Sequence, residues 1–293
     1  MSLAPPKMNS VSYDWETKPM KKTSLLLFCI IIMTASCTKT NMLSSSITSN
    51  RDSSSSGTED VSYSAFADNI NFYENKDGTC TADGAYVDPE IKEITIPDKS
   101  ISGKTVTSIS GFNDRKYLEK VTLPSSLKEI QQDTFSYDIS LKNIVFPEIL
   151  ERISSCSFLK CSSLSEIRLP ESLQTMDDSA FQYCVNLKTV RIPSHIKNIP
   201  DNAFDECTNL KDIYLPDGLE SIGIAAFGYT SIDKIFIPKS VNKISINAFV
   251  NYPNRKTTLY VEAKSHPASW QLKSNNSNCR FIYGASRQDL DDA

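Results

Sequence analysis

The chain has 293 residues, of which 31 are basic and 35 are acidic, and its formal net charge is −4. Proteins that hold nucleic acid by electrostatics carry a basic stripe or a strong positive charge, so this balance excludes that class. The length fits one or two domains.

The first recognisable element is a secretory signal. Two lysines, a nine-residue apolar run (residues 25–33) and two small residues follow one another before Cys37. Nine apolar residues are too few to anchor a helix across a bilayer, and the order of basic, apolar and small segments is typical of a signal peptide. We expect residues 1–36 to be this signal, with residues 1–19 lying upstream of a true start at Met20.

Cys37 resembles the modified cysteine of a lipobox, before which a signal peptidase cleaves and whose thiol carries the lipid. Thr34 departs from the pattern, which usually has leucine there. The alternatives are an ordinary signal with a coincidental cysteine and, less favoured, a membrane-spanning helix. Residues 37–60 are rich in serine and threonine and poor in apolar side chains, which predicts a flexible tether.

Two residue types mark an internal repeat, because each recurs every 22 or 23 residues. The one exception is the first gap between prolines, which is longer. The prolines are Pro97, Pro124, Pro147, Pro170, Pro193, Pro216 and Pro238. The phenylalanines are Phe112, Phe135, Phe158, Phe181, Phe204, Phe227 and Phe249. Two independent markers with the same step indicate a stack of repeated units.

Each unit predicts a short strand, a proline and a turn. In the unit that begins at Leu164, Ile167 and Leu169 alternate with outward residues, which predicts a strand with one apolar face. Pro170 ends the strand because it has no N–H for the ladder. One unit cannot bury its apolar face, whereas stacked units can. Stacking would also place Phe135, Phe158, Phe181, Phe204 and Phe227 in one internal column of offset rings.

The unit resembles that of the BspA-like (Treponema-type) leucine-rich-repeat family, in which Leu-x-x-Ile-x-Leu-Pro precedes an Ile-Gly-x-x-Ala-Phe turn and a cysteine. Residues 222–227 come closest to that turn, and the resemblance covers about residues 61–284. It implies a leucine-rich-repeat solenoid, a right-handed superhelix that is mainly β with short helical turns and about seven 23-residue units. The cysteine is missing from four units.

The flanks of the repeats look like caps, which a solenoid needs to cover its open ends. We expect an N-terminal cap and first strand over residues 61–96 and the repeats over residues 97–256. A C-terminal cap should follow over residues 257–293, in which Arg287–Ala293 is a frayed tail.

Cys161, Cys184 and Cys207 recur at one repeat position and should therefore stack. The favoured interpretation is three small buried thiols in the same core position. A disulfide between two neighbouring rungs is an alternative, because a rung spacing of about 4.8 Å lies within the range of disulfide geometry. Metal ligation is disfavoured, since no paired cysteine or histidine motif supports a tetrahedral site.

No set of residues predicts catalysis. The two histidines, His195 and His266, are expected at the surface, and neither has a nucleophile and an acid that the sequence places beside it. The neighbouring carboxylates Asp177 and Asp178 are interpreted as solvated turn residues. We therefore expect no catalytic residue, no metal and no cofactor.

The outward middle residues of the strands are the candidates for binding. In chain order they are Thr95, Thr122, Val145, Arg168, Arg191, Tyr214 and Phe236. Arginine and aromatic residues are enriched in binding hot spots, and neighbouring exposed aromatics indicate an interaction site. We therefore expect Arg168, Arg191, Tyr214 and Phe236 to form a ligand-binding patch. The alternative is a loosely varied sheet surface, or one covered by part of the tether.

These features favour a non-catalytic protein that binds a protein or glycan ligand and is anchored by lipid in the cell envelope of a Gram-negative bacterium. It would sit at the outer membrane, on the periplasmic or the surface side, and contact the membrane through the lipid alone. The alternative is a structural or assembly component of the envelope. Repeat scaffolds bind unrelated partners, so the sequence does not name the ligand.

Overall fold

The computed structural model describes residues 64–65, 69–272 and 278–292. The chain divides into two compact units, Met1–Thr58 and Glu59–Ala293, and the described residues all belong to the second. The expected signal peptide, the tether and Cys37 lie outside the described residues.

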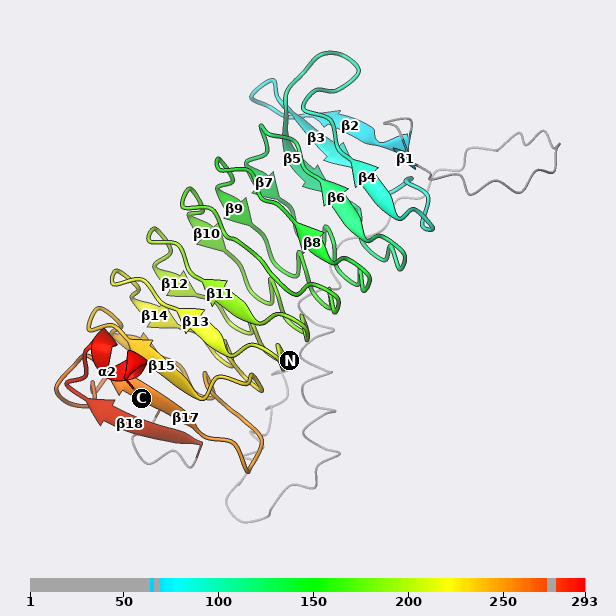
Figure 1. Ribbon diagram of the computed structural model, residues 1–293. Helices are drawn as coiled ribbons and strands as arrows, with labels where there is room; N and C mark the ends of the chain where they lie inside the picture. Colours follow the sequence, from blue (N-terminus) through cyan, green and yellow to red (C-terminus); the bar gives the residue numbers. More distant parts are fainter. Residues whose placement is uncertain (1–63, 66–68, 273–277, 293) are drawn as a thin grey trace, which may run out of the picture. The chain divides into compact units, whose positions relative to one another are not determined.

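The described part of the second unit is a stack of coils that place their strands in two rows (Figure 1). The strands of the first row are β1 (Ser64–Ala65), β4 (Glu93–Thr95), β6 (Lys120–Thr122), β8 (Asn143–Ile144), β11 (Thr189–Arg191), β13 (Asp212–Tyr214), β15 (Lys234–Ile237), β17 (Thr257–Val261) and β18 (Cys279–Tyr283). All pairings in this row are parallel. The rung at residues 164–170, between β8 and β11, is not a regular strand, so the strand predicted at Ile167 and Leu169 is wrong for this unit.

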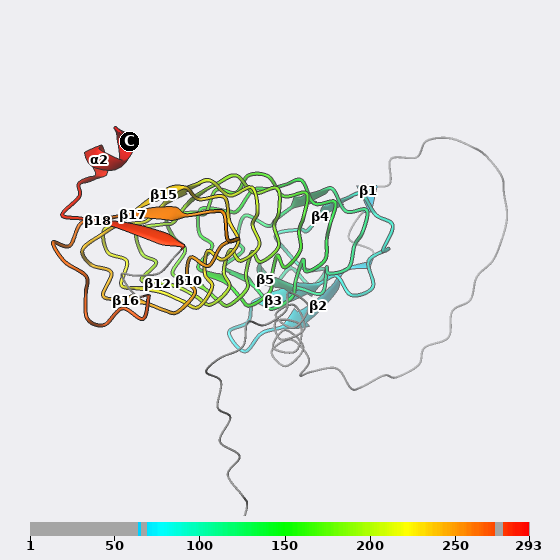
Figure 2. The ribbon, with the colours of Figure 1, turned by 90° about the horizontal axis from the view of Figure 1, so that it is seen from below.

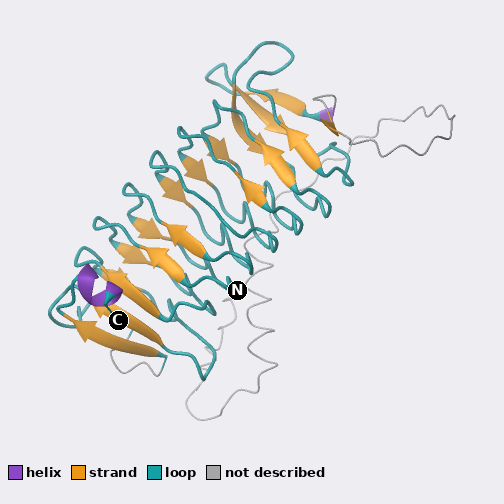
Figure 3. Ribbon diagram, in the orientation of Figure 1, coloured by secondary structure: helices purple, strands orange, loops and turns teal. Residues whose placement is uncertain are grey.

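The second row lies on the opposite side of the coils (Figure 2). Its strands are β2 (Asn71–Glu74), β3 (Cys80–Asp83), β5 (Val106–Ser110), β7 (Glu129–Ile130), β9 (Arg152–Ile153), β10 (Thr175–Met176), β12 (Asn198–Ile199), β14 (Ser221–Ile222) and β16 (Lys243–Ile244). The pairs are parallel except β2 with β3. The segments between the rows are loops rather than helices (Figure 3).

The repeat step sets the register between coils. Thr189 pairs with Asp212 and Arg191 pairs with Tyr214, so residues 23 positions apart lie side by side. In each strand the apolar residue between two outward residues is buried, as alternation along a strand requires. This arrangement is the solenoid that the sequence repeat predicts.

Seven phenylalanine rings form one column in the core. They are all at most 2% exposed, and neighbouring ring centroids are 5.1–5.8 Å apart with interplanar angles of 2–29°. The prediction for Phe135 through Phe227 is confirmed, and the column extends to Phe112 and Phe249. An offset pair of this kind contributes about 0.5–1.5 kcal/mol beyond the burial of its area.

Left-handed residues lie two positions before and two after the phenylalanine of a turn. Around Phe181 they are Ser179 (φ 57°) and Tyr183 (φ 61°). Such a conformation costs a non-glycine residue about 1–3 kcal/mol. The left-handed conformation persists because carbonyl groups of the next coil accept hydrogen bonds from both backbone amides. Ser179 N–H donates to the Asp201 carbonyl (3.0 Å), and Tyr183 N–H donates to the Asp205 carbonyl (2.9 Å). Stacking thus stabilises turns that a single coil would not hold.

The residue three positions after the phenylalanine also points into the core. Cys161, Cys184 and Cys207 are fully buried, and each thiol donates to the carbonyl of the phenylalanine one coil earlier at 3.1–3.2 Å. Burial raises the pKa of all three thiols well above the usual value. None of the three forms a disulfide, as the interpretation of buried core thiols predicts.

Asp138 occupies the cysteine position one coil earlier and carries a buried carboxyl group. Its Oδ1 accepts from the backbone N–H of Arg115 (2.8 Å), whereas Oδ2 has no hydrogen-bond partner. Burial raises the pKa of Asp138 to about 8, against the smaller opposing effects of the Arg115 amide and guanidinium. The folded protein therefore holds a proton on this carboxyl where an unfolded chain would release it.

We predict that Asp138 lowers the stability of the protein as the pH rises from about 4 to about 8. Below the ordinary pKa of 3.8 the carboxyl is protonated in both states. Between the two pKa values only the unfolded state ionises, which favours unfolding, and above about 8 the loss is constant. A shift of this size corresponds to a loss on the order of a few kcal/mol.

The unfolding free energy of the Asp138→Asn variant should therefore fall less steeply with pH between about pH 4 and about pH 8, the window set by the two pKa values. Urea unfolding at a series of pH values measures this slope. Asp212→Asn, which removes an exposed carboxylate from β13, is the control and should keep the slope of the unaltered chain. Equal slopes for Asp138→Asn and the unaltered chain would contradict the prediction.

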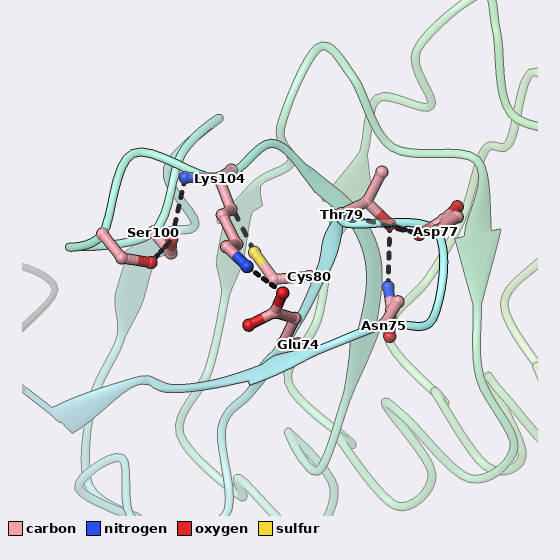
Figure 4. A network of polar contacts seen from close by, with 8 residues as sticks. Glu74, Asn75, Asp77, Thr79, Cys80, Ser100 and Lys104 are labelled. Atoms are coloured by element: carbon pink, nitrogen blue, oxygen red, sulfur yellow. Dashed lines mark hydrogen bonds and ion pairs between the residues drawn. The ribbon is translucent and has the colours of Figure 1, made fainter.

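A hairpin closes the N-terminal end of the stack. β2 and β3 pair in antiparallel fashion around a turn at residues 75–78. In this turn the Asp77 carboxylate accepts from the backbone N–H (3.0 Å) and the hydroxyl (2.6 Å) of Thr79. Lys104 forms an ion pair with Glu74, and its backbone N–H donates to the Ser100 hydroxyl (3.1 Å), which ties the loop before β5 to the hairpin (Figure 4).

An aromatic cluster closes the C-terminal end. His266 meets the rings of Trp270 and Phe281 edge-on, and its Nδ1 lies 2.9 Å from the Tyr283 hydroxyl. The expectation of a surface His266 is therefore wrong, because the cap half-buries this ring among its aromatic residues. His195 is exposed, as expected.

The residues expected to fray form a short helix instead. Helix α2 spans Arg287–Asp291 and begins at Ser286, whose side chain and that of Asp289 form a reciprocal capping box. The prediction of a frayed tail is wrong for these residues. The physical reason is their contact with the first strand row, which involves the candidate site.

Candidate binding face

The outward residues of the first row form one continuous column, which we call the outward strand face. It comprises Thr95, Thr122, Val145, Arg168, Arg191, Tyr214 and Phe236 and continues through Tyr260 and Ile282. Strand pairing places Thr95 beside Thr122, Arg191 beside Tyr214, and Phe236 beside Tyr260, which in turn pairs with Ile282. Val145 and Arg168 hold the same repeat position in rungs where they are not part of a paired strand. The sequence-predicted column therefore exists in the fold, although its members differ in exposure.

Arg191 and Tyr214 form an exposed pair at the centre of the face. The Arg191 guanidinium carbon lies 4.6 Å from the centre of the Tyr214 ring, and Tyr214 is 44% exposed. A cation–π contact of this kind contributes about 0.5–1 kcal/mol at an exposed site. The contact holds both side chains in place and leaves one edge of each open to solvent.

Arg168 lies on the preceding rung and is also exposed. Its guanidinium is 3.6 Å from a Glu148 carboxylate oxygen, and both side chains are mostly solvent-accessible. Exposed ion pairs contribute about 0–1 kcal/mol, so this contact leaves Arg168 free to rearrange.

Phe236 does not take part in the exposed patch, and the expectation that it does is wrong. Its side chain is only 4% exposed, and Tyr260 on the next rung is 9% exposed. The two rings form an apolar cluster with Ala285, against which Ile282 and Leu290 pack. The cause is the C-terminal segment, which folds back over this end of the face.

A hollow of about 590 Å³ lies at the other end of the face, over β4, β6 and β8. Its lining includes the apolar residue Val145, which is 81% exposed. Ion pairs line its sides, among them Lys142 with Glu119 at 2.5 Å. The Lys142 ammonium lowers the pKa of Glu119 by hydrogen bonding and by its charge. This hollow was not predicted from the sequence, although an apolar Val145 in an outward column was a signal for it.

A second surface feature that the sequence analysis missed follows the left-handed residues after the phenylalanines. The Lys160 ammonium lies 4.7 Å from the centre of the Tyr137 ring and 5.7 Å from that of Tyr183. Further along, the rings of Tyr229 and Tyr252 are 5.1 Å apart. Tyr137, Tyr183 and Tyr229 recur two positions after a phenylalanine in the sequence, which was the available signal, whereas Tyr252 lies three positions after Phe249.

The described residues offer no metal centre. In the part of the chain that the structure describes, no group of three or more His, Cys, Asp or Glu side chains is placed to hold a metal ion. His195 is exposed, and its Nδ1 lies 3.0 Å from the backbone carbonyl oxygen of Glu171 in a loop. Among the same described residues, no helix has the length and apolar character to cross a membrane.

A two-row solenoid with an internal phenylalanine column and an apolar residue at every strand centre defines a leucine-rich-repeat fold. The BspA type leucine rich repeat region matches in six copies over residues 79–138 and 128–256, which is more than half of the chain. The chain belongs to this family. The resemblance and the fold class expected from the sequence are thereby confirmed.

Two solved structures are similar to the chain. A leucine rich cell surface protein from Faecalibacterium prausnitzii A2-165 is 30% identical with a TM-score of 0.63, over 74% of this chain and 57% of that one. The chain thus spans just over half the length of that protein. A leucine-rich repeat protein from T. pallidum is 24% identical with a TM-score of 0.54, over 67% of this chain and 86% of that one, which supports the fold alone. The comparison with curated proteins gave no match.

Proposed function

We propose that the chain is an exported, non-catalytic protein, held in the bacterial cell envelope by a lipid on Cys37, that binds a protein or glycan with its outward strand face. The observation that carries the proposal is the exposed Arg191–Tyr214 pair at the centre of that face. Arginine and tyrosine provide hot spots in many interfaces, because each combines a large contact area with hydrogen-bonding groups.

The contrast between core and surface columns supports a binding role. The core positions repeat with little change, whereas the outward column passes from threonine through valine and arginine to tyrosine along the stack. A rigid face with varied side chains can complement one partner, and it lies on strands rather than on loops. The similarity to a cell surface protein of Faecalibacterium prausnitzii supports export.

We expect the double variant Arg191→Ala, Tyr214→Ala to lose binding to the ligand by at least about tenfold, since a single hot-spot truncation costs about 2 kcal/mol or more. An array of glycans and envelope proteins, probed with the unaltered chain and the variant, measures this loss. Asn198→Ala, Lys243→Ala is the matched control, because both residues are exposed on the second row. Equal signals from the two double variants on every ligand would contradict the proposed face.

The anchoring part of the proposal predicts that Cys37→Ser releases the protein from the membrane fraction. A lipidated cysteine is the sole attachment proposed, and serine has no thiol to carry the lipid. Fractionation of cells that express each form, with mass analysis of the N-terminal peptide, measures the change. Retention of the serine variant in the membrane fraction would mean that another element anchors the chain.

A further inference from the structure

The C-terminal segment, residues 286–292, lies on the outward strand face at β15 (Figures 1 and 2). The Arg287 guanidinium carbon is 4.6 Å from the centre of the Phe236 ring. One guanidinium nitrogen donates to the Leu215 carbonyl (2.9 Å) and also pairs with the Asp217 carboxylate. The Arg287 side chain thus contacts three groups: the Phe236 ring, the Leu215 carbonyl just after β13 and the Asp217 carboxylate.

A second set of contacts holds the other end of the segment. The Lys234 ammonium donates to the Leu290 carbonyl (2.8 Å), and the Leu290 side chain packs against the cluster of Phe236 and Tyr260. Leu290 follows Arg287 by three positions, which places both on one side of a helical turn. The face therefore binds three groups of the segment: an arginine side chain, a nearby apolar side chain and a backbone carbonyl.

The segment is only weakly held. No residue of α2 is buried, the Arg287 side chain is 43% exposed and that of Asp217 is 83% exposed. Five residues are too few to form a stable helix alone, and the exposed ion pair and the cation–π contact each contribute about 1 kcal/mol or less. A segment with such contacts opens locally far more often than the core unfolds.

Release of the segment would extend the exposed part of the face. Phe236 and Tyr260 occupy the two rungs after Tyr214 in the same column. With the segment lifted, Arg191 and the three aromatic residues Tyr214, Phe236 and Tyr260 would form one uninterrupted exposed row. The covered end is therefore continuous with the part of the face that is already open.

We propose that residues 286–292 act as an internal stand-in for an arginine-bearing peptide segment of a partner protein, which binds at Phe236 after displacing them. The proposal rests on the outward strand face being the binding surface and adds which ligand chemistry its C-terminal end takes. The guanidinium lies over Phe236 and bonds to Leu215 and Asp217, and an apolar side chain three positions later packs on Tyr260.

The test uses the full chain with a weakened tail, Arg287→Ala, Leu290→Ala, and a peptide with the sequence of residues 284–293. Amide shifts in NMR spectra report where the peptide binds. We expect shifts at Phe236 and Tyr260, with a half-saturating peptide concentration at least about tenfold lower than in the unaltered chain, where the attached tail competes at high effective concentration. The matched control is Gln288→Ala, which alters the tail without removing a contact to the face.

The specificity for arginine is tested with a second peptide in which Gln replaces Arg287. We expect it to bind at least about tenfold more weakly, and the Phe236→Ala chain with the weakened tail to lose binding of the arginine peptide. Absence of shifts at β15 and β17, or equal affinity of the two peptides, would overturn the proposal and leave the tail as a cap. Light scattering decides whether the tail instead binds a second copy of the chain. If the unaltered chain is a dimer and the chain with the weakened tail is a monomer, the proposal is also overturned.

The two proposals can fail separately. If the peptide does not bind but Arg191→Ala, Tyr214→Ala still lowers the array signal, the inference about the tail is wrong and the binding face stands. If the peptide binds and the array signal does not depend on Arg191 and Tyr214, the open part of the face is not the ligand site.

Discussion

The in-register stacking of coils 23 residues long is the constraint on which the rest of the molecule depends. The phenylalanine column, with centroid separations of 5.1–5.8 Å, forms only when each coil repeats the register of the last. The left-handed turn residues likewise depend on carbonyl acceptors in the next coil. Each coil therefore stabilises its neighbours. The same register places equivalent outward residues of paired strands side by side on the outward strand face.

The stacking also explains which polar groups the core tolerates. The cysteine position accepts a thiol because the preceding phenylalanine carbonyl lies 3.1–3.2 Å away. In the coil of Asp138 the same position holds a carboxyl group with one unpartnered oxygen, and its pKa rises to about 8. Thr230 holds the same position in a later coil and donates its hydroxyl to the Phe227 carbonyl (3.0 Å), so Asp138 differs from it in having an oxygen without a partner.

Most of the fold could be predicted from the sequence, because the repeat encodes local geometry. The alternation of apolar and outward residues, the proline that follows and the recurring phenylalanine each correspond to a physical role in the coil, although the rung that holds Ile167 and Leu169 forms no regular strand. The C-terminal segment could not be predicted in this way. Its position depends on the contacts of Arg287 with Asp217, 70 residues earlier, and with the ring of Phe236 on another coil, which no local pattern encodes. The same contact removed Phe236 from the exposed patch, whereas Arg191 and Tyr214 lie where alternation placed them.

The register can be measured directly by cross-linking. Thr189 and Asp212 are paired residues on neighbouring strands, and paired positions at about 4.8 Å lie within disulfide reach. Under mild oxidation the full chain with Thr189→Cys, Asp212→Cys should form a disulfide between these positions, identified as a linked peptide by mass spectrometry. The combination Thr189→Cys, Tyr214→Cys, displaced by two residues, should stay reduced. Equal cross-linking of both pairs, or linkage of the displaced pair alone, would contradict in-register stacking.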